Sequence, residues 1–276
     1  MNSIGFIGLG NIGAPMATNL LDHPAGLVVR DLSEELTEPF AAKGATVATS
    51  TAQVAEQCSV ISVMVRDDAQ VRTVVGELLP AARAGTVIAI HSTIDARTAI
   101  ELAETAAAAG VHIIDAPVSG GFMGAHSGEL AVMVGGSVEA MEAVKEPFSA
   151  FADLVLHMGP VGAGTKTKLA RNMMHFAAYA AAGEAQRLVE AVGISPQVLG
   201  QIVRHSDAVT GGPGAILVRD TAAPFTPDDP LRGSFEHARE LGEKDLTLAL
   251  EMASEAGVDV PMATLALNRL AGELGL

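Results

Sequence analysis

Over the first 160 residues, short runs of β-branched and other apolar residues alternate with longer stretches of helical periodicity. This alternation is typical of βαβ units, in which each helix crosses back over a parallel sheet. The expected strands are Ile4–Ile7, Leu27–Arg30, Val60–Val65, Val87–His91, Val111–Asp115, Leu130–Val134 and Leu154–His157. The expected helices include Ile12–Asp22, Glu34–Lys43, Asp68–Leu79, Ala96–Ala109 and Val138–Phe148. We therefore expect an α/β domain with a Rossmann-type, doubly wound sheet at residues 1–160.

The strand signals fade after Gly164, and only helical patterns follow. The stretch from Thr165 to Ala191 predicts one helix of about 27 residues, roughly 40 Å long at 1.5 Å per residue. Further helices are expected at Pro196–His205, Phe235–Ala256 and Pro261–Leu274. We therefore expect an all-α domain at residues 161–276, joined to the first domain by the long helix.

The segment from Thr210 to Pro230 concentrates glycine and proline between two of these helices. An irregular loop of this length in a compact domain is usually a lid, a binding loop or a disordered segment. The sequence leaves these alternatives open.

The composition limits the binding partners and the cellular compartment that we expect for this protein. The 276 residues include 17 Lys and Arg against 32 Asp and Glu, a formal net charge of −15. This charge repels phosphate backbones and anionic lipid headgroups, so we expect neither nucleic acid nor membrane partners. No apolar run approaches the roughly 18 residues of a membrane span. A single cysteine, Cys58, and a first strand that follows Met1 without a leader-like segment favour a cytoplasmic protein.

The clearest candidate for chemistry is a glycine-rich loop after the first predicted strand. Its residues are Gly8, Leu9, Gly10, Asn11, Ile12 and Gly13. Glycines with this spacing allow a tight turn, the approach of a pyrophosphate to backbone N–H groups, and packing of the next helix on the strand. The loop therefore predicts a dinucleotide site. The alternative is a purely structural turn.

Asp31 ends the second predicted strand, 18 residues after Gly13. A carboxylate at this point can accept hydrogen bonds from both ribose hydroxyls and repel a 2′-phosphate, which favours NAD over NADP. Arg30 precedes it and could accommodate a 2′-phosphate, so NADP remains possible. The alternative role for Asp31 is the N-cap of the next helix.

A second candidate is the segment Asp115–Gly121, at the carboxyl end of a predicted strand, where open α/β sheets bind ligands. Ser119 offers a hydroxyl, and Gly120 and Gly121 let successive N–H groups point into one concavity suited to a carboxylate. The alternative is a plain strand-to-loop turn.

A third candidate, Gly159–Lys168, superficially resembles a phosphate-binding P-loop. Thr165 stands between Gly164 and Lys166, however, and breaks the required spacing. We therefore interpret its glycines as an interdomain hinge before the long helix. On that helix Lys168 and Asn172 are one turn apart on the same face. A desolvated lysine there has a lowered pKa, as general acid–base catalysis requires, whereas a solvated lysine is the alternative.

The remaining motifs are weaker. Lys244 and Asp245 open an apolar-periodic run and by themselves fit a solvated, charged turn. The eight histidines have no metal-ligand spacing, so no metal site is expected. The sequence contains no Gly-x-Ser-x-Gly elbow, the motif that would indicate a serine hydrolase.

Four blocks together resemble the β-hydroxyacid dehydrogenase family, whose members include 3-hydroxyisobutyrate dehydrogenase, tartronate semialdehyde reductase and, more distantly, 6-phosphogluconate dehydrogenases. The blocks are Gly5–Ala17, Asp115–Gly121, Gly162–Gly164 with Lys168 and Asn172, and Lys244–Asp245. Their order and spacing extend over nearly the whole chain. The resemblance implies a Rossmann domain, a long interdomain helix, and an all-α domain that often builds a homodimer or homotetramer.

The resemblance also implies residue roles. Lys168 is the expected catalytic lysine, with Asn172 as its partner on the substrate, and Ser119, Gly120 and Gly121 form the carboxylate site. Met64, Val65, Thr93 and Lys244 match cofactor-contacting positions. The expected reaction is the NAD(P)-dependent interconversion of a small 3-hydroxy acid with its semialdehyde or keto acid. An imine reductase of the same fold and a non-catalytic NAD-binding sensor or scaffold remain as alternatives, although imine reductases usually carry Asp or Tyr at the position of Lys168.

Overall fold

The computed structural model describes residues 3–276. The chain forms two compact units, Met1–Arg171 and Asn172–Leu276. The units divide inside helix α8 (Ala163–Ala191), whereas the sequence-based division at residues 160 and 161 lies just before this helix.

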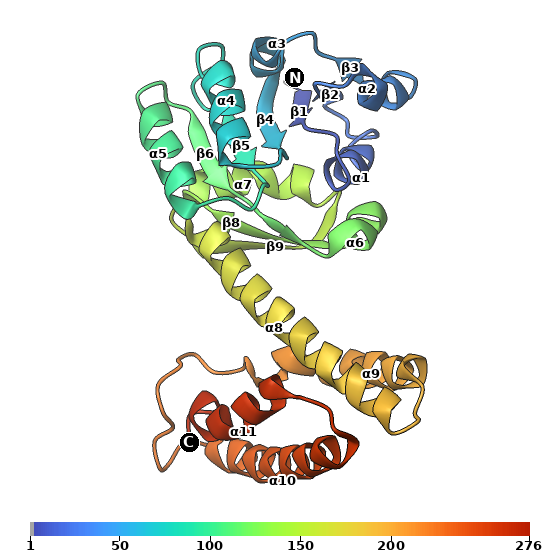
Figure 1. Cartoon of the computed structure of the whole chain (residues 1–276). Coiled ribbons are helices and arrows are strands. Elements are labelled where there is room, and N and C mark those ends of the chain that lie inside the picture. Colours follow the sequence, from blue (N-terminus) through green and yellow to red (C-terminus); the bar gives the residue numbers. More distant parts are fainter. Residues whose placement is uncertain (1–2) are drawn as a thin grey trace. The chain divides into compact units, whose positions relative to one another are not determined.

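Within the described part of the first unit, strands and helices alternate as the sequence predicts (Figure 1). The strands are β1 (Ser3–Ile7), β2 (Leu27–Arg30), β3 (Thr46–Val47), β4 (Cys58–Val63), β5 (Val87–Ile90), β6 (His112–Asp115), β7 (Val118–Ser119), β8 (Leu130–Gly135) and β9 (Ala152–Gly159). The helices are α1 (Gly13–Thr18), α2 (Glu34–Ala41), α3 (Thr51–Gln57), α4 (Asp68–Leu78), α5 (Ala96–Ala107), α6 (Gly121–Ser127) and α7 (Val138–Phe148).

The strands form one sheet in the order β3-β2-β1-β4-β5-β6-β8-β7, with β9 paired to β8. All pairs from β3 through β6 are parallel, which confirms the Rossmann-type sheet. Strand β8 is antiparallel to β6 and β7 and parallel to β9. The direction of the sheet therefore changes next to Asp115, which pairs with Gly135 across this junction.

Helices cover both faces of the sheet, and each face has its own core. Successive strand residues point to opposite faces, so Phe6 joins one core and Ile7 the other. The first core packs against helices α1, α6 and α7, for example through Met16 and Phe148. The second packs against α3, α4 and α5, for example through Leu78. Two-sided burial explains the continuous apolar runs of these strands.

The second unit is helical. After α8 it contains α9 (Pro196–Thr210), the 3₁₀ helix η1 (Gly212–Ile216), α10 (Arg232–Ala256) and α11 (Pro261–Glu273). The glycine- and proline-rich segment is partly ordered by packing. Phe225 is buried, its ring centroid lies 5.0 Å from that of Phe235, and the Arg219 guanidinium lies 3.9 Å from the same ring.

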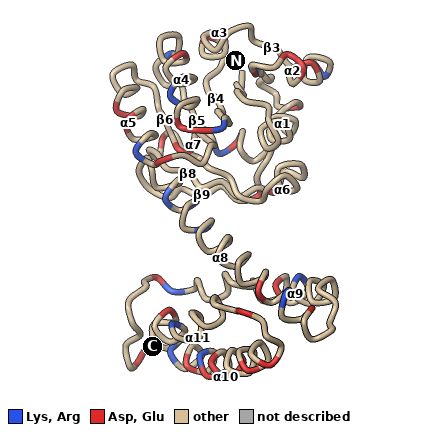
Figure 2. Tube along the Cα trace, viewed as in Figure 1, with Lys and Arg blue, Asp and Glu red and all other residues tan. Residues whose placement is uncertain are grey.

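Charged residues are spread over the helices of both units, with acidic positions on α2, α5 and α10 (Figure 2). Among residues 3–276, no helix is both long and apolar enough to cross a membrane.

Candidate active site

The glycine-rich loop connects β1 to α1 and lines a cleft of about 810 Å³ in the first unit. Gly8 has a φ of +95°, and a Cβ there would collide with the carbonyl oxygen of Met64. A Cβ on Gly13 would collide with the carbonyl oxygen of Gly8. These two glycines are therefore required by the fold of the loop itself.

Gly10 has a different role. It lines the cleft, and a Cβ added to it would meet nothing within 4 Å. The backbone is thus bare where a ligand phosphate would have to approach it, and a side chain would occupy that space. Asn11 and Ile12 line the same part of the cleft. The loop therefore fits the pyrophosphate of a dinucleotide.

Asp31 follows β2 and lies against the glycine-rich loop. One carboxylate oxygen accepts the Leu9 N–H at 2.6 Å, and the other accepts the Ser33 N–H at 2.9 Å. Ser33, not Asp31, is the N-cap residue of α2, so the helix-capping alternative is wrong. Leu9 itself is buried, its N–H is already bonded to Asp31, and it is not among the residues lining the cleft.

Arg30 lines the cleft beside Asp31 and donates from Nη1 to the Asp31 carbonyl oxygen at 2.7 Å. Its Nε is buried without a hydrogen-bond partner within the described chain. An unsatisfied buried donor beside a cleft fits a site that accepts a polar ligand group.

The opposite edge of the cleft follows β4. Met64 and Val65 line it, and their predicted contact with the cofactor stays a prediction. Ser92, just after β5, donates its hydroxyl to the Val65 carbonyl oxygen at 2.7 Å and accepts the Val65 N–H at 2.9 Å. Thr93 is exposed next to Ser92 and is not among the residues lining the cleft.

The cleft also contains residues that the sequence analysis did not select. They are Leu32, Thr51, Arg66, Ala69, Gln70, Thr73, Val74 and Glu77. Most lie on or near α4, where ordinary polar and small residues carry no local motif. Leu32, one of them, is 92% exposed.

A second group of residues meets at the start of α8. Asp115, at the end of β6, is fully buried, and its carboxylate accepts the N–H groups of Gly162 and Thr165, each at 2.6 Å. A carboxylate in this position satisfies unpaired donors of the first helical turn and interacts favourably with the helix dipole. Asp115 therefore fixes the beginning of this helix.

The glycines of this region are packing residues, and the hinge interpretation is wrong for Gly164. A Cβ on Gly164 would collide with the carbonyl oxygen of Met133 in β8. Gly162 has a φ of +92°, and a Cβ there would lie 3.0 Å from the Ile100 side chain. Close contact with β8 explains glycine at position 164, and a positive φ together with the contact with α5 explains glycine at position 162.

Lys168 follows Thr165 by one turn of α8 and is only 9% exposed. Burial lowers its pKa below the ordinary value of 10.5, and the positive charge of Arg171 lowers the pKa further. Both effects increase the neutral fraction of the amine near pH 7. Asn172 follows one further turn along α8, on the side of the helix that carries Lys168.

Ser119 ends β7, which pairs with β8, and Gly120 and Gly121 lead into α6. The glycines have φ angles of +137° and +64°, which only glycine adopts readily. The Gly120 backbone lies against Leu130, so this turn is tightly held. The predicted carboxylate site at these residues stays a prediction.

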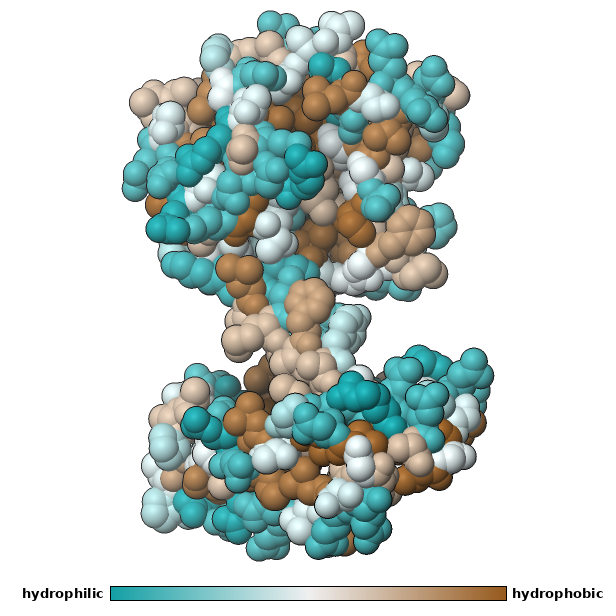
Figure 3. All heavy atoms as spheres, in the orientation of Figure 1, coloured by the Kyte–Doolittle hydropathy of each residue, from teal (hydrophilic) through white to brown (hydrophobic). Residues whose placement is uncertain are grey.

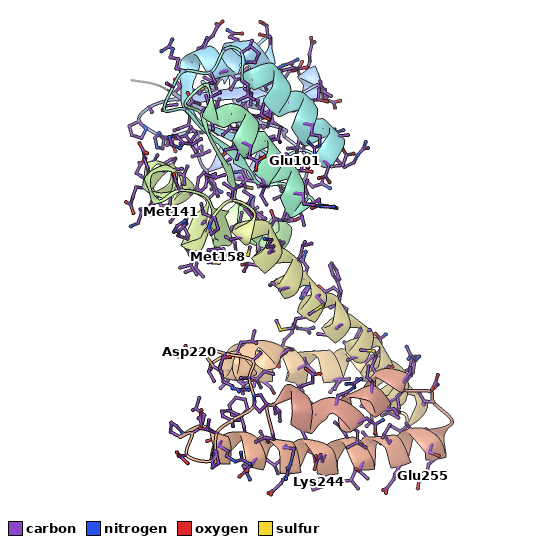
Figure 4. The ribbon with its side chains drawn as sticks, turned by 90° about the vertical axis from the view of Figure 1, so that its left-hand side faces the viewer. Glu101, Met141, Met158, Asp220, Lys244 and Glu255 are labelled. Atoms are coloured by element: carbon purple, nitrogen blue, oxygen red, sulfur yellow. The ribbon has the colours of Figure 1, made fainter. Side chains whose placement is uncertain are left out.

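Lys244 projects from α10 in the second unit (Figure 4). Its Nζ lies 3.0 Å from the Asp245 carboxylate, and its side chain is 61% exposed. The predicted contact of Lys244 with the cofactor stays a prediction. Within residues 3–276, no group of three or more His, Cys, Asp or Glu side chains could hold a metal ion.

Two family models together match most of the chain. One, for the NAD-binding domain of 6-phosphogluconate dehydrogenase, matches residues 3–159. The other, for the NAD-binding region of NADP-dependent 3-hydroxyisobutyrate dehydrogenase, matches residues 162–272.

Individual proteins are similar over almost the full length. An uncharacterized oxidoreductase of Mycobacterium tuberculosis is 55% identical, over 99% of this chain and 93% of its own length. The 2-(hydroxymethyl)glutarate dehydrogenase of Eubacterium barkeri is 34% identical, over 95% of this chain and 86% of its own. The crystal structure of an oxidoreductase from Mycobacterium avium 104 has a TM-score of 0.96 and 53% identity, covering 100% of this chain and 99% of that one. An imine reductase from Pseudomonas sp. shares the fold alone, at 18% identity and a TM-score of 0.73.

Proposed function

Because the chain belongs to the β-hydroxyacid dehydrogenase family of NAD(P)-dependent oxidoreductases acting on CH–OH groups, we propose that it interconverts a small 3-hydroxy acid and its semialdehyde or keto acid. The observation that carries the proposal is the buried Lys168, with a lowered pKa, at the start of a helix fixed by Asp115. The related 2-(hydroxymethyl)glutarate dehydrogenase is named for a substrate that is itself a 3-hydroxy acid.

In the oxidation, neutral Lys168 accepts the proton of the substrate hydroxyl at Nζ, while Asn172 orients the substrate from the next turn of the helix. Bound NAD(P) supplies the acceptor for the hydride that leaves the carbinol carbon. In the reverse direction, protonated Lys168 donates the proton to the carbonyl oxygen. Ser119, Gly120 and Gly121 hold the substrate carboxylate with local N–H and O–H donors, which a chain of net charge −15 needs in place of long-range attraction.

The direct test is the initial rate of NADH formation with 3-hydroxyisobutyrate, 3-hydroxypropionate, glycerate and serine. We expect turnover with at least one of these acids. Tight NAD(P) binding without turnover of any of them would contradict the proposed substrate class and favour an imine or unfamiliar carbonyl substrate, or a non-catalytic sensor. The likeness to imine reductases reaches only the fold and favours no imine chemistry here.

The rate of oxidation should rise with pH, because only the neutral amine of Lys168 accepts a proton. Arg171→Gln removes the positive charge that lowers the pKa of Lys168, so the rise should move to higher pH. The measurement is the pH profile of kcat for both proteins, with the exposed Lys166→Gln as the matched control. A profile of Arg171→Gln that is unshifted, or shifted to lower pH, would show that Lys168 does not limit the rate.

The preference for NAD is a further proposal, and it rests on the Asp31 carboxylate at the cleft. Asp31→Asn keeps one acceptor oxygen but removes the charge, so kcat/KM for NADP should rise about fivefold or more relative to NAD, since a like-charge contact at 4 Å is worth at least about 1 kcal/mol. Initial rates with both cofactors measure the ratio. A wild-type preference for NADP would mean that Arg30 dominates, and Arg30→Gln should then abolish it.

We also propose a homodimer or homotetramer built through the helical unit. The described part of this unit buries few apolar side chains: Leu188, Phe225, Phe235, Ala253, Val260 and Leu274. Large apolar side chains are exposed on its surface (Figure 3): Ile194, Val198, Ile202, Val203, Val209, Leu241, Leu248 and Leu265. A second copy of the chain is the proposed partner that covers these exposed apolar side chains. Sedimentation velocity should give an oligomer that Ile202→Asp weakens, whereas a wild-type monomer at micromolar concentration would refute the proposal.

A further inference from the structure

His91 follows β5 and is buried, with both ring nitrogens engaged. Nδ1 lies 2.7 Å from the Ala116 carbonyl oxygen, and Nε2 lies 3.0 Å from the Ser62 hydroxyl oxygen. A carbonyl oxygen only accepts, so Nδ1 carries the proton and Nε2 accepts from the Ser62 hydroxyl. The ring is therefore fixed in one tautomer.

Aromatic side chains enclose the ring. Its centroid lies 6.4 Å from the stacked Phe6 ring, 5.1 Å from Phe148 and 5.8 Å from the edge-on Phe151. Burial lowers the pKa of His91 to about 4, so it stays neutral in ordinary assays. Because the ring is enclosed and both of its nitrogens are engaged, His91 does not reach a substrate, but it can hold its partners in place.

The partner that matters is Ala116. In the chain it lies between Asp115, which holds the start of α8, and the turn at Ser119, Gly120 and Gly121. The Ala116 N–H donates to the Ile90 carbonyl oxygen at 2.8 Å, and its carbonyl accepts from His91. The preceding residue, Asp115, holds the start of the helix that carries Lys168. The segment that follows Ala116 leads to Ser119, Gly120 and Gly121.

We propose that His91 is a positioning residue for this site: through Ala116 it fixes the Asp115 cap on one side and the carboxylate-binding turn on the other. The catalytic part of this inference rests on the proposed function. The structural part, in which His91 positions Ala116 and its neighbours, does not rest on the proposed function and can be tested without substrate.

Two substitutions separate the hydrogen bonds of the ring. The Asn side-chain nitrogen is three bonds from Cα, as Nδ1 is, so His91→Asn keeps a donor for Ala116. The Gln nitrogen is four bonds from Cα, as Nε2 is, so His91→Gln reaches Ser62 and leaves the Ala116 carbonyl without its donor. Ser62→Ala is the control that removes only the Ser62 hydroxyl, and His91→Phe fills the aromatic cage without either bond.

We expect His91→Gln and His91→Phe to lower kcat/KM for the hydroxy acid about tenfold to a hundredfold, because small displacements of positioned groups cost this much. His91→Asn and Ser62→Ala should stay within about threefold of wild type, and the Kd of NAD(P) should not change in any variant. Hydrogen exchange should accelerate in His91→Gln at the amides of Ala116, of residues 118–121, and of Gly162 and Thr165, and not in His91→Asn.

Equal losses in the Asn and Gln variants that follow their Tm values would make His91 an ordinary core residue and overturn the proposal. Unchanged exchange at Gly162 and Thr165 in both His91→Gln and His91→Phe would overturn it as well. If the wild-type protein turns over no 3-hydroxy acid, the proposed function fails, and the exchange data alone decide the role of His91.

Discussion

Replacing Lys168 by alanine should lower kcat for hydroxy-acid oxidation by roughly 10²–10⁴-fold, the usual contribution of a general acid–base residue. The Kd of NAD(P) should stay within about twofold of wild type, because the cofactor cleft is lined by other residues. Kinetics under saturating substrate measure the first quantity, and fluorescence titration with NADH measures the second. Lys166→Ala is the matched control, since it removes an exposed lysine from the same turn of the same helix.

The split between kcat and cofactor affinity is what identifies the role of Lys168. An equal loss of NADH affinity would make Lys168 a structural residue of the cleft. A loss of kcat by less than tenfold would place the proton transfer elsewhere in the site.

Replacing Gly10 by valine should weaken NAD(P) binding by about fivefold to a hundredfold and leave Tm unchanged. The new side chain has open space around it in the free protein, but it occupies the approach to the backbone in the cleft. Overpacking costs of about 1–3 kcal/mol correspond to this range at 1.4 kcal/mol per tenfold change in Kd. Isothermal titration with NADH and a thermal melt provide the two measurements.

Gly13→Ala provides the contrast, because its Cβ would collide with the Gly8 carbonyl oxygen and should lower Tm as well as affinity. Gly233→Ala on α10 also introduces a Cβ into open space, so it should leave the affinity unchanged and should not lower Tm. An unaltered Kd in Gly10→Val would mean that the pyrophosphate does not lie over this loop.

The parts of the site that the sequence predicts are those whose residues lie close together in the chain. The glycine-rich loop and Asp31 fall within the first βαβ unit, and the bond from Leu9 to Asp31 joins residues only 22 positions apart. A local motif therefore contains most of the geometry. Short elements escaped prediction for the opposite reason: β3 and β7 have two residues each, too few for any periodic pattern.

The second group of residues depends on contacts that no local pattern encodes. Asp115 bonds with Gly162 and Thr165 across 47 and 50 positions, and His91 reaches Ala116 and Ser62 across 25 and 29. In the sequence Asp115 begins a candidate segment but has no assigned role, and His91 is one of eight scattered histidines. Their roles arise from the sheet junction, which the hydrophobic pattern does not predict.

The buried carboxylate of Asp115 determines where the chain can be cut. A fragment that ends at residue 160 would keep this charge in the interior without its N–H donors, and an uncompensated buried charge costs about 3–5 kcal/mol. A fragment that ends at Arg171 retains both donors and the full contact of Gly164 with β8. The smallest autonomous nucleotide-binding piece of this protein therefore includes the first turns of α8, and Lys168 comes with it.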